Sequence, residues 1–441
     1  MSRQTASRRS FLHFAAASLS PASAAARSGA VKLAGFRADA TPATGEPLIW
    51  VTPLQTVLDP LWAKGLVLEQ GGRRLVICAM DWCALGGAAY HKLRHAMAQA
   101  AGGAEVLLHT VHQHAAPYVD GDAYALLREL PNPPLLYTVA GLDQLADRLA
   151  RAVKEALGKL RPVEQIGVSQ AQVERVASSR RVWDQGKLVV RYSTGGRDSY
   201  QAQLPEGHVD PWLKTITFAS GGRPLARLHF YATHPQTFCC DGRASADFVG
   251  EARERLEREE GAFQIYLTGC AGDVTVGKYN DGSEEARRQL AERLLAAMKA
   301  AASDVRFYAL KAARWRTIAV RLPAREPDKP IEAPADPTAR YRAACRVAFA
   351  HRKAPLLVTA VNLGEARILH LPGEPMLDFQ IYAQRRLPQA FVATAGYGDI
   401  APGYLCTDQA IREGGYEPSA SHVAVGGESA LKEAIGQALA V

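Results

Sequence analysis

Two histidines, two residues apart, are the first candidates for chemistry in this sequence. His112 and His114 follow a short apolar run, residues 106–108, which predicts a buried strand that Pro117 helps to end. If the chain is still extended there, both rings face the same side, roughly 6–7 Å apart. The pair can therefore present two imidazoles to one metal ion or one substrate. The alternative is two ordinary surface or hydrogen-bonded histidines.

Two further reactive residues stand where apolar strands give way to proline or glycine. His234 precedes Pro235, and Glu374 lies between Gly373 and Pro375. Residues that follow a strand lie at the edge of a sheet, where pockets form. Two histidines and one carboxylate are a usual ligand set for catalytic zinc, which keeps a position open for water. Taken alone, His234 is equally consistent with a buried structural histidine, and Glu374 with the cap of a following helix.

The elements that must position these residues alternate between strand and helix patterns. Residues 74–110 contain a strand, a helix and a strand in succession, which is typical of an α/β layer. A long amphipathic helix is expected over residues 138–157, and Ser283 is a plausible N-cap for another. His234 follows an expected strand at residues 225–231, and Glu374 follows a hairpin that turns at Gly364.

The end of the chain continues this pattern. Residues 391–395 are expected to form the last strand, followed by a Gly- and Tyr-rich loop over 396–416 and a helix over 428–439. The Pro- and acid-rich residues 326–337 are interpreted as a surface loop rather than a linker, and we find no internal repeat. We therefore expect mixed β-sheets flanked by helices in a single large catalytic domain, residues 27–441.

Composition agrees with a globular protein. Of 441 residues, 48% are hydrophobic and 22% charged, which is ordinary for a folded domain. The net charge is +8, and no block of basic residues stands out, so nucleic-acid binding has no support. The seven cysteines form no zinc-binding or redox motif. One or two disulfides are possible, and an odd count leaves at least one cysteine unpaired.

Residues 1–26 have the features of a twin-arginine signal peptide. Ser7-Arg8-Arg9-Ser10-Phe11-Leu12 precedes a modestly apolar, small-residue stretch that ends in alanines, with cleavage expected near Ala24 to Ala26. That stretch is too short to cross a bilayer and Pro21 interrupts it, so no transmembrane anchor is expected. The protein is therefore predicted to be exported to the periplasm or secreted, with the twin-arginine export machinery as a transient partner.

Four motifs together resemble the catalytic domain of the neutral/alkaline, non-lysosomal ceramidases. Thr110-Val111-His112-Gln113-His114-Ala115-Ala116-Pro117 is similar to that family's Thr-x-His-Thr-His-Ser-Gly-Pro segment. Gly272-Asp273-Val274-Thr275 resembles Gly-Asp-Val-Ser, and Pro372-Gly373-Glu374 resembles Pro-Gly-Glu. Gly403-Tyr404-Leu405-Cys406-Thr407 resembles Gly-Tyr-Val-Thr-Thr, with Tyr416 at the expected offset. The four occur in the family's order.

The resemblance implies a site and a reaction. It implies that Zn²⁺ is bound by two histidines, a carboxylate and a phenol, and that zinc-bound hydroxide attacks the carbonyl of an N-acyl amide. Two further side chains and an arginine are implied to bind or polarise the substrate amide. A fourth residue stands at the family's functional serine, and Asp247 is implied to support the site indirectly. The implied ligands are His112, His234, Glu374 and Tyr404. The implied catalytic residues are His114, Thr275, Tyr416 and an arginine, for which Arg180 is preferred over its neighbour Arg181.

This sequence departs from the family in two ways. Thr275 stands where the family has a serine, which keeps the hydroxyl but adds a methyl group that restricts χ1. The C-terminal immunoglobulin-like domain of the family is not expected here. The prediction is an exported zinc-dependent amide hydrolase for a lipid or small-molecule N-acyl substrate. The alternatives are a metal-dependent hydrolase of another amide or ester, and a non-catalytic exported binding protein. Serine-hydrolase chemistry is disfavoured because no Gly-x-Ser-x-Gly occurs.

Overall fold

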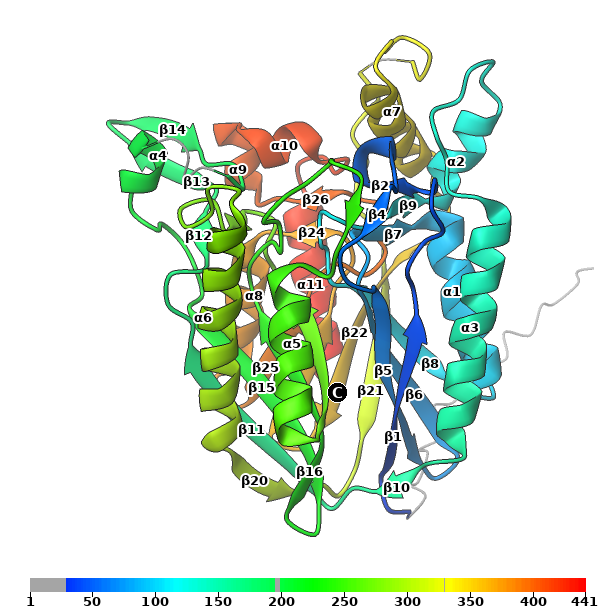
Figure 1. Cartoon of the computed structure of the whole chain (residues 1–441), viewed down its shortest axis with the longest axis vertical. Coiled ribbons are helices and arrows are strands. Elements are labelled where there is room, and N and C mark those ends of the chain that lie inside the picture. Colours follow the sequence, from blue (N-terminus) through cyan, green and yellow to red (C-terminus); the bar gives the residue numbers. More distant parts are fainter. Residues whose placement is uncertain (1–28, 195–198, 329) are drawn as a thin grey trace, which may run out of the picture.

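The fold is built from three larger β-sheets with helices packed against them (Figure 1). The computed structural model describes residues 29–194, 199–328 and 330–441. The expected class, mixed β-sheets flanked by helices, is confirmed. The predicted signal peptide, residues 1–26, lies outside the described residues and stays a prediction.

Two of the larger sheets have five strands and the third has four. The first sheet has the order β10 (Arg161–Pro162), β1 (Lys32–Asp39), β5 (Trp62–Gln70), β6 (Arg73–Met80), β8 (Glu105–Thr110). The second has the order β18 (Phe263–Thr268), β16 (Arg223–Tyr231), β15 (Trp212–Ser220), β11 (Gln165–Gln172), β20 (Arg306–Ala309). The third has the order β21 (Arg314–Val320), β22 (Leu356–Leu363), β23 (Ala366–His370), β25 (Phe391–Ala395).

The same topology occurs in all three sheets. Three antiparallel strands are followed by a helix and then by a fourth strand parallel to the third: β1-β5-β6-α1-β8, β11-β15-β16-α5-β18 and β21-β22-β23-α8-β25. The sequence contains no matching repeat, so similar strand and helix patterns produce this topology without similar residues. The ends of the three final strands meet. The Gly396 N–H donates to the Thr268 carbonyl at 3.0 Å, and the Thr110 N–H donates to the Tyr397 carbonyl at 2.9 Å.

Helices cover the outer sides of the sheets. The helix α1 packs with α3 beside β1, α5 packs with α6 beside β18 and β11, and α11 packs against β21 and β22 (Figure 1). The longer helices are α1 (Gly87–Ala100), α2 (Gly121–Arg128), α3 (Val139–Leu157), α5 (Asp247–Glu260), α6 (Glu284–Ser303), α7 (Pro337–Ala350), α8 (Leu377–Arg386) and α11 (Gly427–Leu439). The short ones are η1 (Ile49–Val51), α4 (Ser199–Gln203), α9 (Asp408–Glu413) and α10 (Tyr416–Ala420).

Several local predictions are confirmed. Thr138 caps α3 by accepting a hydrogen bond from the Gly141 N–H, and the predicted apolar stripe of that helix is buried. Ser283 caps α6 through the Ala286 N–H. The hairpin β22–β23 turns at Gly364, where φ is +83°, a value that glycine adopts readily.

Other regions differ from the expectation. The segment after β25 is not a single loop, because it contains β26 (Tyr404–Leu405), α9 and α10. The helix α7 was not predicted, although Asp336 caps it and Pro337 occupies its first turn. Glu374 does not cap the following helix, since α8 begins at Leu377 with Met376 as its N-cap residue.

Short two-stranded pairings lie beyond the ends of the larger sheets and hold the loops of the candidate site. They are β2 (Pro47–Leu48) with β3 (Thr52–Pro53), β4 (Thr56–Val57) with β17 (Arg243–Ala244), β7 (Ala84–Gly86) with β9 (Tyr118–Asp120), β12 (Ser178–Ser179) with β19 (Val274–Thr275), β13 (Arg181–Asp184) with β14 (Lys187–Val190), and β24 (Glu374–Pro375) with β26. Ladders of two residues are weak alone, so burial and side-chain contacts must stabilise them.

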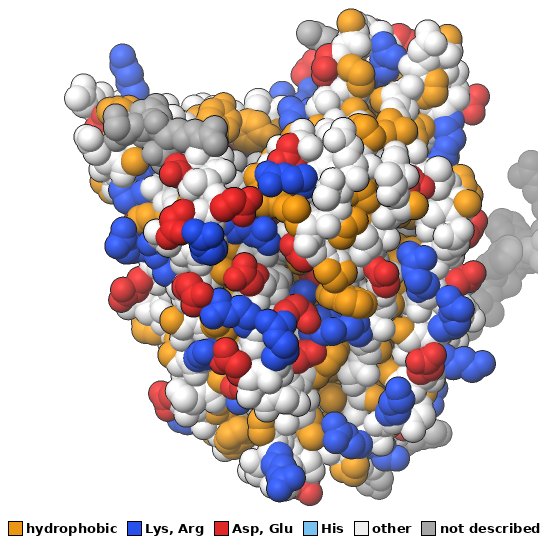
Figure 2. All heavy atoms as spheres, viewed as in Figure 1, with side chains coloured by type: hydrophobic (Ala, Val, Ile, Leu, Met, Phe, Trp, Pro, Cys, Tyr) orange, Lys and Arg blue, Asp and Glu red, His pale blue; other side chains and the backbone are white. Residues whose placement is uncertain are grey.

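The surface and the cysteines show ordinary features. Lysine, arginine, aspartate and glutamate are interspersed over the face in Figure 2 that includes α5 and α6. One disulfide joins the neighbours Cys239 and Cys240, and the five other cysteines are unpaired and buried. None of the helices in the described ranges combines the length and apolar character that a bilayer crossing requires.

Candidate metal centre

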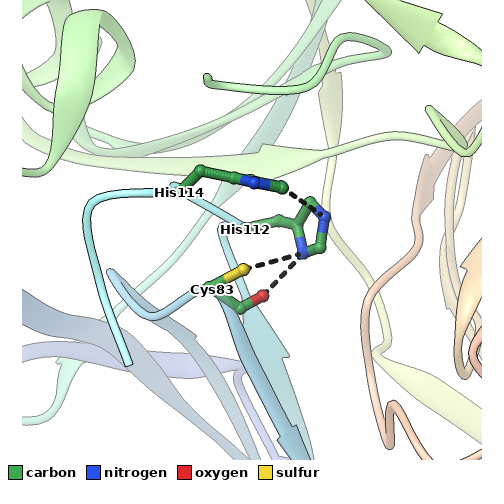
Figure 3. Close-up of side chains that lie close together, drawn as sticks. All are labelled: Cys83, His112 and His114. Atoms are coloured by element: carbon green, nitrogen blue, oxygen red, sulfur yellow. Dashed lines mark hydrogen bonds between the residues drawn. The ribbon is translucent and has the colours of Figure 1, made fainter. Parts of the chain in front are cut away.

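The two histidines after β8 approach each other by a route that the sequence did not predict. The strand ends at Thr110, and His112 has φ of +74°, so the chain is not extended there. The His112 N–H donates to the Trp82 carbonyl at 2.9 Å, which fixes this turn. The two rings lie edge to face with centroids 4.9 Å apart, and their Nε2 atoms are 3.3 Å apart (Figure 3).

Backbone carbonyls orient two of the imidazoles. The Nδ1 of His112 is 2.6 Å from the Cys83 carbonyl oxygen (Figure 3), and the Nδ1 of His234, after β16, is 3.0 Å from the Val274 carbonyl oxygen. A carbonyl can only accept, so each Nδ1 carries the proton. Each Nε2 then offers a lone pair when the ring is neutral. This outer hydrogen bond is the usual arrangement behind metal-binding histidines.

Glu374 completes this group. It forms β24, pairs directly with Tyr404 of β26, and places Oε2 3.2 Å from His112 Nε2 and 3.4 Å from His234 Nε2. All three side chains are buried, and the potential ligand atoms lie within 4.8 Å of one another. His112, His234 and Glu374 together form the His–His–Glu group.

The electrostatics of the His–His–Glu group call for a cation. Burial and the nearby charge of Arg180 lower the pKa of His234 to about 4, so its ring is neutral at pH 7. Burial raises the pKa of Glu374, but the contacts with His112 and His234 outweigh it and hold that pKa well below its ordinary value. Neither His234 Nε2 nor Glu374 Oε2 has a hydrogen-bond partner among the described residues. Buried electron-pair donors facing one another without a proton or a metal ion are unfavourable, so the residues fit a divalent ion.

A second group, Cys83 with His112 and His114, is a poorer metal site. Burial raises the pKa of the Cys83 thiol well above its ordinary value, and the Glu374 charge adds to this effect. Metals bind the thiolate rather than the thiol. His112 Nδ1 lies 3.8 Å from the sulfur, and it already donates to the Cys83 carbonyl.

Arg180 joins the remaining predicted residues to the His–His–Glu group. Its guanidinium donates to the Tyr404 hydroxyl at 3.2 Å and lies 3.5 Å from Glu417. Its Cζ is 5.1 Å from the centre of the Tyr416 ring. Arg181, the competing choice, shares Glu417 at 3.2 Å, but its other ion pair is with Glu413 at 2.9 Å rather than with Tyr404 or Tyr416. The geometry therefore favours Arg180 as the arginine of this site.

Thr275 and Asp247 lie behind these residues. Thr275 pairs with Ser178 in the β12–β19 ladder, and its buried hydroxyl has no partner among the described residues. Asp247 accepts hydrogen bonds from the Thr237 N–H at 2.9 Å and the Thr237 hydroxyl at 2.7 Å, three residues after His234. Asp247 thus fixes the loop that follows His234.

A pocket of about 200 Å³ opens onto this arrangement. It is lined by residues from η1, α7 and α10, and Figure 2 shows the surface hollowed beside α7. Of the predicted site residues, the pocket lining includes His112, His114, Glu374, Tyr404 and Tyr416. His234, Arg180 and Thr275 are buried outside that lining. The contacts above join six of the eight predicted residues. Tyr416 contacts Arg180 through its ring. Thr275 is linked to the group through its neighbour Val274, whose carbonyl accepts from His234, and through its strand partner Ser178.

Sequence reasoning missed two neighbours of His112. The Tyr397 ring stacks on the His112 ring with centroids 4.3 Å apart and planes 28° apart, and its hydroxyl is buried without a partner among the described residues. No role in the site was predicted for Tyr397. The second neighbour is the Cys83 carbonyl, a main-chain group that every residue has, so the residue type at this position could not reveal its role. The position of Tyr397 two residues after β25 was the available clue, because His112 likewise lies two residues after β8.

The fold is shared with solved structures of neutral ceramidases. The crystal structure of neutral ceramidase from Pseudomonas aeruginosa aligns with a TM-score of 0.72 and 16% identity, covering 93% of this chain and 74% of that one. A structure of ceramidase complexed with C2 aligns with a TM-score of 0.71 and 14% identity, at the same coverage. No family model matches the chain, and no curated protein matches its sequence. The structural likeness confirms the resemblance at the level of the fold.

Proposed function

We propose that this protein is a zinc-dependent hydrolase that cleaves the amide bond of a ceramide-like N-acyl substrate. The observation that carries the proposal is the convergence of His112 Nε2, His234 Nε2 and Glu374 Oε2, the last two of which have no hydrogen-bond partner among the described residues. The fold shared with neutral ceramidases supports amide hydrolysis as the reaction class.

The His–His–Glu group would hold the ion, with Tyr404 as a fourth protein ligand. Tyr404 is the strand partner of Glu374, so both ligands belong to one short ladder. Zinc bound there would polarise the substrate carbonyl and lower the pKa of a coordinated water to about 7. Arg180 donates to the Tyr404 hydroxyl and so favours its anionic form, although burial raises the pKa of that phenol.

The remaining pocket residues have separate roles in the proposal. His114 is neutral at pH 7, because burial and the neighbouring His112 and His234 hold its pKa well below the ordinary value. Its Nδ1 has no partner among the described residues, so it can take a proton and deliver it to the leaving amine. Tyr416 lines the pocket and would donate to the developing oxyanion, while Arg180 supplies positive charge nearby.

Metal analysis of the purified protein tests the proposal directly. We expect about one zinc per chain, lost in His112→Ala and in His234→Ala because each removes a ligand. The control is His208→Ala, which changes an exposed histidine away from the pocket lining and should keep its metal. A metal-free wild-type protein that also fails to take up added zinc would refute the proposal.

An amide or ester other than ceramide is a second candidate substrate. The pocket of about 200 Å³ is smaller than the several hundred cubic ångströms usual for drug-sized ligands. Thr275 also replaces the serine of the resembling motif. Turnover assays with long-chain ceramide and with short N-acyl amides separate the two candidates. A loaded protein that hydrolyses no amide and no ester would instead be a binding protein.

Export through the twin-arginine route remains part of the proposal. It rests on Ser7-Arg8-Arg9-Ser10-Phe11-Leu12, and the Cys239–Cys240 disulfide is compatible with an oxidising compartment. Cell fractionation tests it: we expect the mature protein outside the cytoplasm, and Arg8→Lys with Arg9→Lys should retain the precursor inside.

A further inference from the structure

One arginine at the mouth of the pocket has no acidic partner within the described ranges. Arg342 lies on α7, lines the pocket and is exposed. Other arginines around the pocket are paired, Arg180 with Glu417 at 3.5 Å and Arg346 with Asp328 at 2.6 Å. The charge of Arg342 is therefore available to a ligand that enters the pocket.

The guanidinium of Arg342 packs over the ring of Trp50. Its Cζ lies 3.9 Å from the centre of the Trp50 ring, which itself stacks on Tyr118 with centroids 5.4 Å apart and planes 27° apart. Trp50 and Tyr118 also line the pocket. A cation–π contact uses the face of the guanidinium and leaves the N–H groups on its edge free to bind oxygen atoms.

The backbone beneath this stack is strained. Trp50 and Val51 have φ of +54° and +57°, a left-handed conformation that non-glycine residues rarely adopt and that bulky or β-branched residues adopt least. Thr338 of α7 donates its hydroxyl to the Trp50 carbonyl at 3.2 Å, which ties the strained turn to the helix that carries Arg342. Strained residues concentrate where a side chain must be held for binding or catalysis.

We propose that Arg342 binds an anionic oxygen group, a carboxylate or a phosphate, on the part of the substrate that is not cleaved. A planar guanidinium offers parallel N–H donors that match two oxygen atoms of such a group. Trp50 orients these donors before the ligand arrives, so less freedom is lost on binding. The inference rests on the proposed function and narrows its substrate class to N-acyl compounds with an acidic head group.

Stable analogues test the inference without turnover. The probes are dodecanesulfonamides of glycine, 4-aminobutanoic acid and 6-aminohexanoic acid, the amino alcohols of equal length, and the phosphate esters of those alcohols. Isothermal titration calorimetry, in which each probe is added to the full-length metal-loaded protein at about 0.15 M salt and pH 7, measures each affinity. We expect an anionic probe to bind about tenfold more tightly than its alcohol for at least one spacer length. The carboxylate and phosphate arms then identify which oxyanion is preferred.

Substitutions of Arg342 must remove this preference. In Arg342→Gln the anionic probe and the alcohol should bind equally, and in Arg342→Lys part of the preference should remain because the charge stays but the paired donors are lost. The matched control is Arg151→Gln, which removes an exposed arginine from α3 outside the pocket lining and should leave the preference unchanged.

Two results would overturn the inference. The first is equal binding, or no binding, of anionic and neutral probes to the wild-type protein, and the second is a preference that persists in Arg342→Gln. Hydrolysis of the matching dodecanoyl amides is assayed separately. Tight anion-dependent binding without hydrolysis would refute the proposed function and leave the inference standing. Hydrolysis with no preference for the acid would support the proposed function and refute the inference about Arg342.

Discussion

A buried ion pair beneath the two pocket histidines offers a quantitative test of the fold. Asp81 follows β6 and accepts hydrogen bonds from both terminal nitrogens of Arg253, each at 2.8 Å. Both side chains are almost fully buried. Asp81 also accepts from the Trp62 N–H at 2.9 Å and from the Gln113 amide at 3.0 Å. Since Gln113 lies between His112 and His114, this carboxylate anchors the histidine segment to the core.

The variant Asp81→Asn keeps the shape and removes the charge. An uncompensated buried partner costs about 3–5 kcal/mol, and the remaining contact of Arg253 with Glu254 at 3.0 Å offsets a part of this. One asparagine oxygen must also replace two carboxylate oxygens, so one of the other donors loses its acceptor, which costs about 1 kcal/mol. We therefore expect a loss of about 4 kcal/mol in the free energy of unfolding. A chain of 441 residues has an unfolding entropy of about 0.9 kcal/mol per kelvin, which gives a Tm lower by about 4–5 °C.

Thermal unfolding followed by circular dichroism measures this shift. The control is Asp143→Asn, which breaks an exposed contact with Lys92, where the aspartate side chain is 54% exposed, and should change Tm by less than about 1 °C. Adding Arg253→Gln to Asp81→Asn should destabilise less than the sum of the single changes, because a neutral pair leaves no unpaired charge. A Tm for Asp81→Asn equal to that of the control, or strictly additive losses, would show that this pair does not anchor the segment.

Three further outcomes follow from other residues. Burial raises the pKa of Asp120 from 3.8 to about 7, so the folded state holds a proton that the unfolded state has released, and stability falls as pH rises between those values. Asp120→Asn keeps the N-cap of α2 and should remove up to roughly 4 kcal/mol of this fall. Urea unfolding at pH 4 and pH 8 measures the free energy of unfolding of both proteins, and an equal change with pH in the wild type and the variant would contradict the prediction. In Gly272→Ala the new Cβ would lie 2.6 Å from the Glu374 carbonyl oxygen, so we expect zinc affinity at least about tenfold lower in chelator competition, and an unchanged affinity would disprove the contact. Thr275→Ser deletes a buried methyl group and should lower stability by about 1 kcal/mol while it increases ceramide cleavage, whereas unchanged cleavage would mean that the methyl does not limit the reaction.

The sequence predicted the positions of chemistry better than the geometry that joins them. His112, His234 and Glu374 stood out because each follows an apolar run, with a proline directly after His234 and Glu374 and five residues after His112. Strand periodicity reports where such runs end, and the resemblance to the ceramidase motifs then selected these three residues as metal ligands. The periodicity also suggested an extended His112–His114 segment, which is wrong, since His112 is left-handed and its turn is fixed by a bond to the Trp82 carbonyl.

Contacts made by backbone atoms had no signal in the residue types. The carbonyls of Cys83 and Val274 orient the imidazoles, and any residue at those positions would offer the same oxygen. The pairing of β24 with β26 joins residues 30 positions apart through a ladder of two residues, too short for a propensity argument. The helix α7 had a signal that was overlooked, an Asp-Pro start followed by a good helix-forming run, and it carries Arg342.

The dependence on main-chain oxygens has an evolutionary consequence. Because the groups that fix the tautomers of His112 and His234 belong to the peptide backbone, no point mutation at Cys83 or Val274 can delete them. Substitutions at those two positions therefore leave the hydrogen bonds to the imidazoles in place. The orientation of the rings changes when the backbone of the loop moves. Such a scaffold permits the residues of the pocket walls to change while the His–His–Glu group keeps its form.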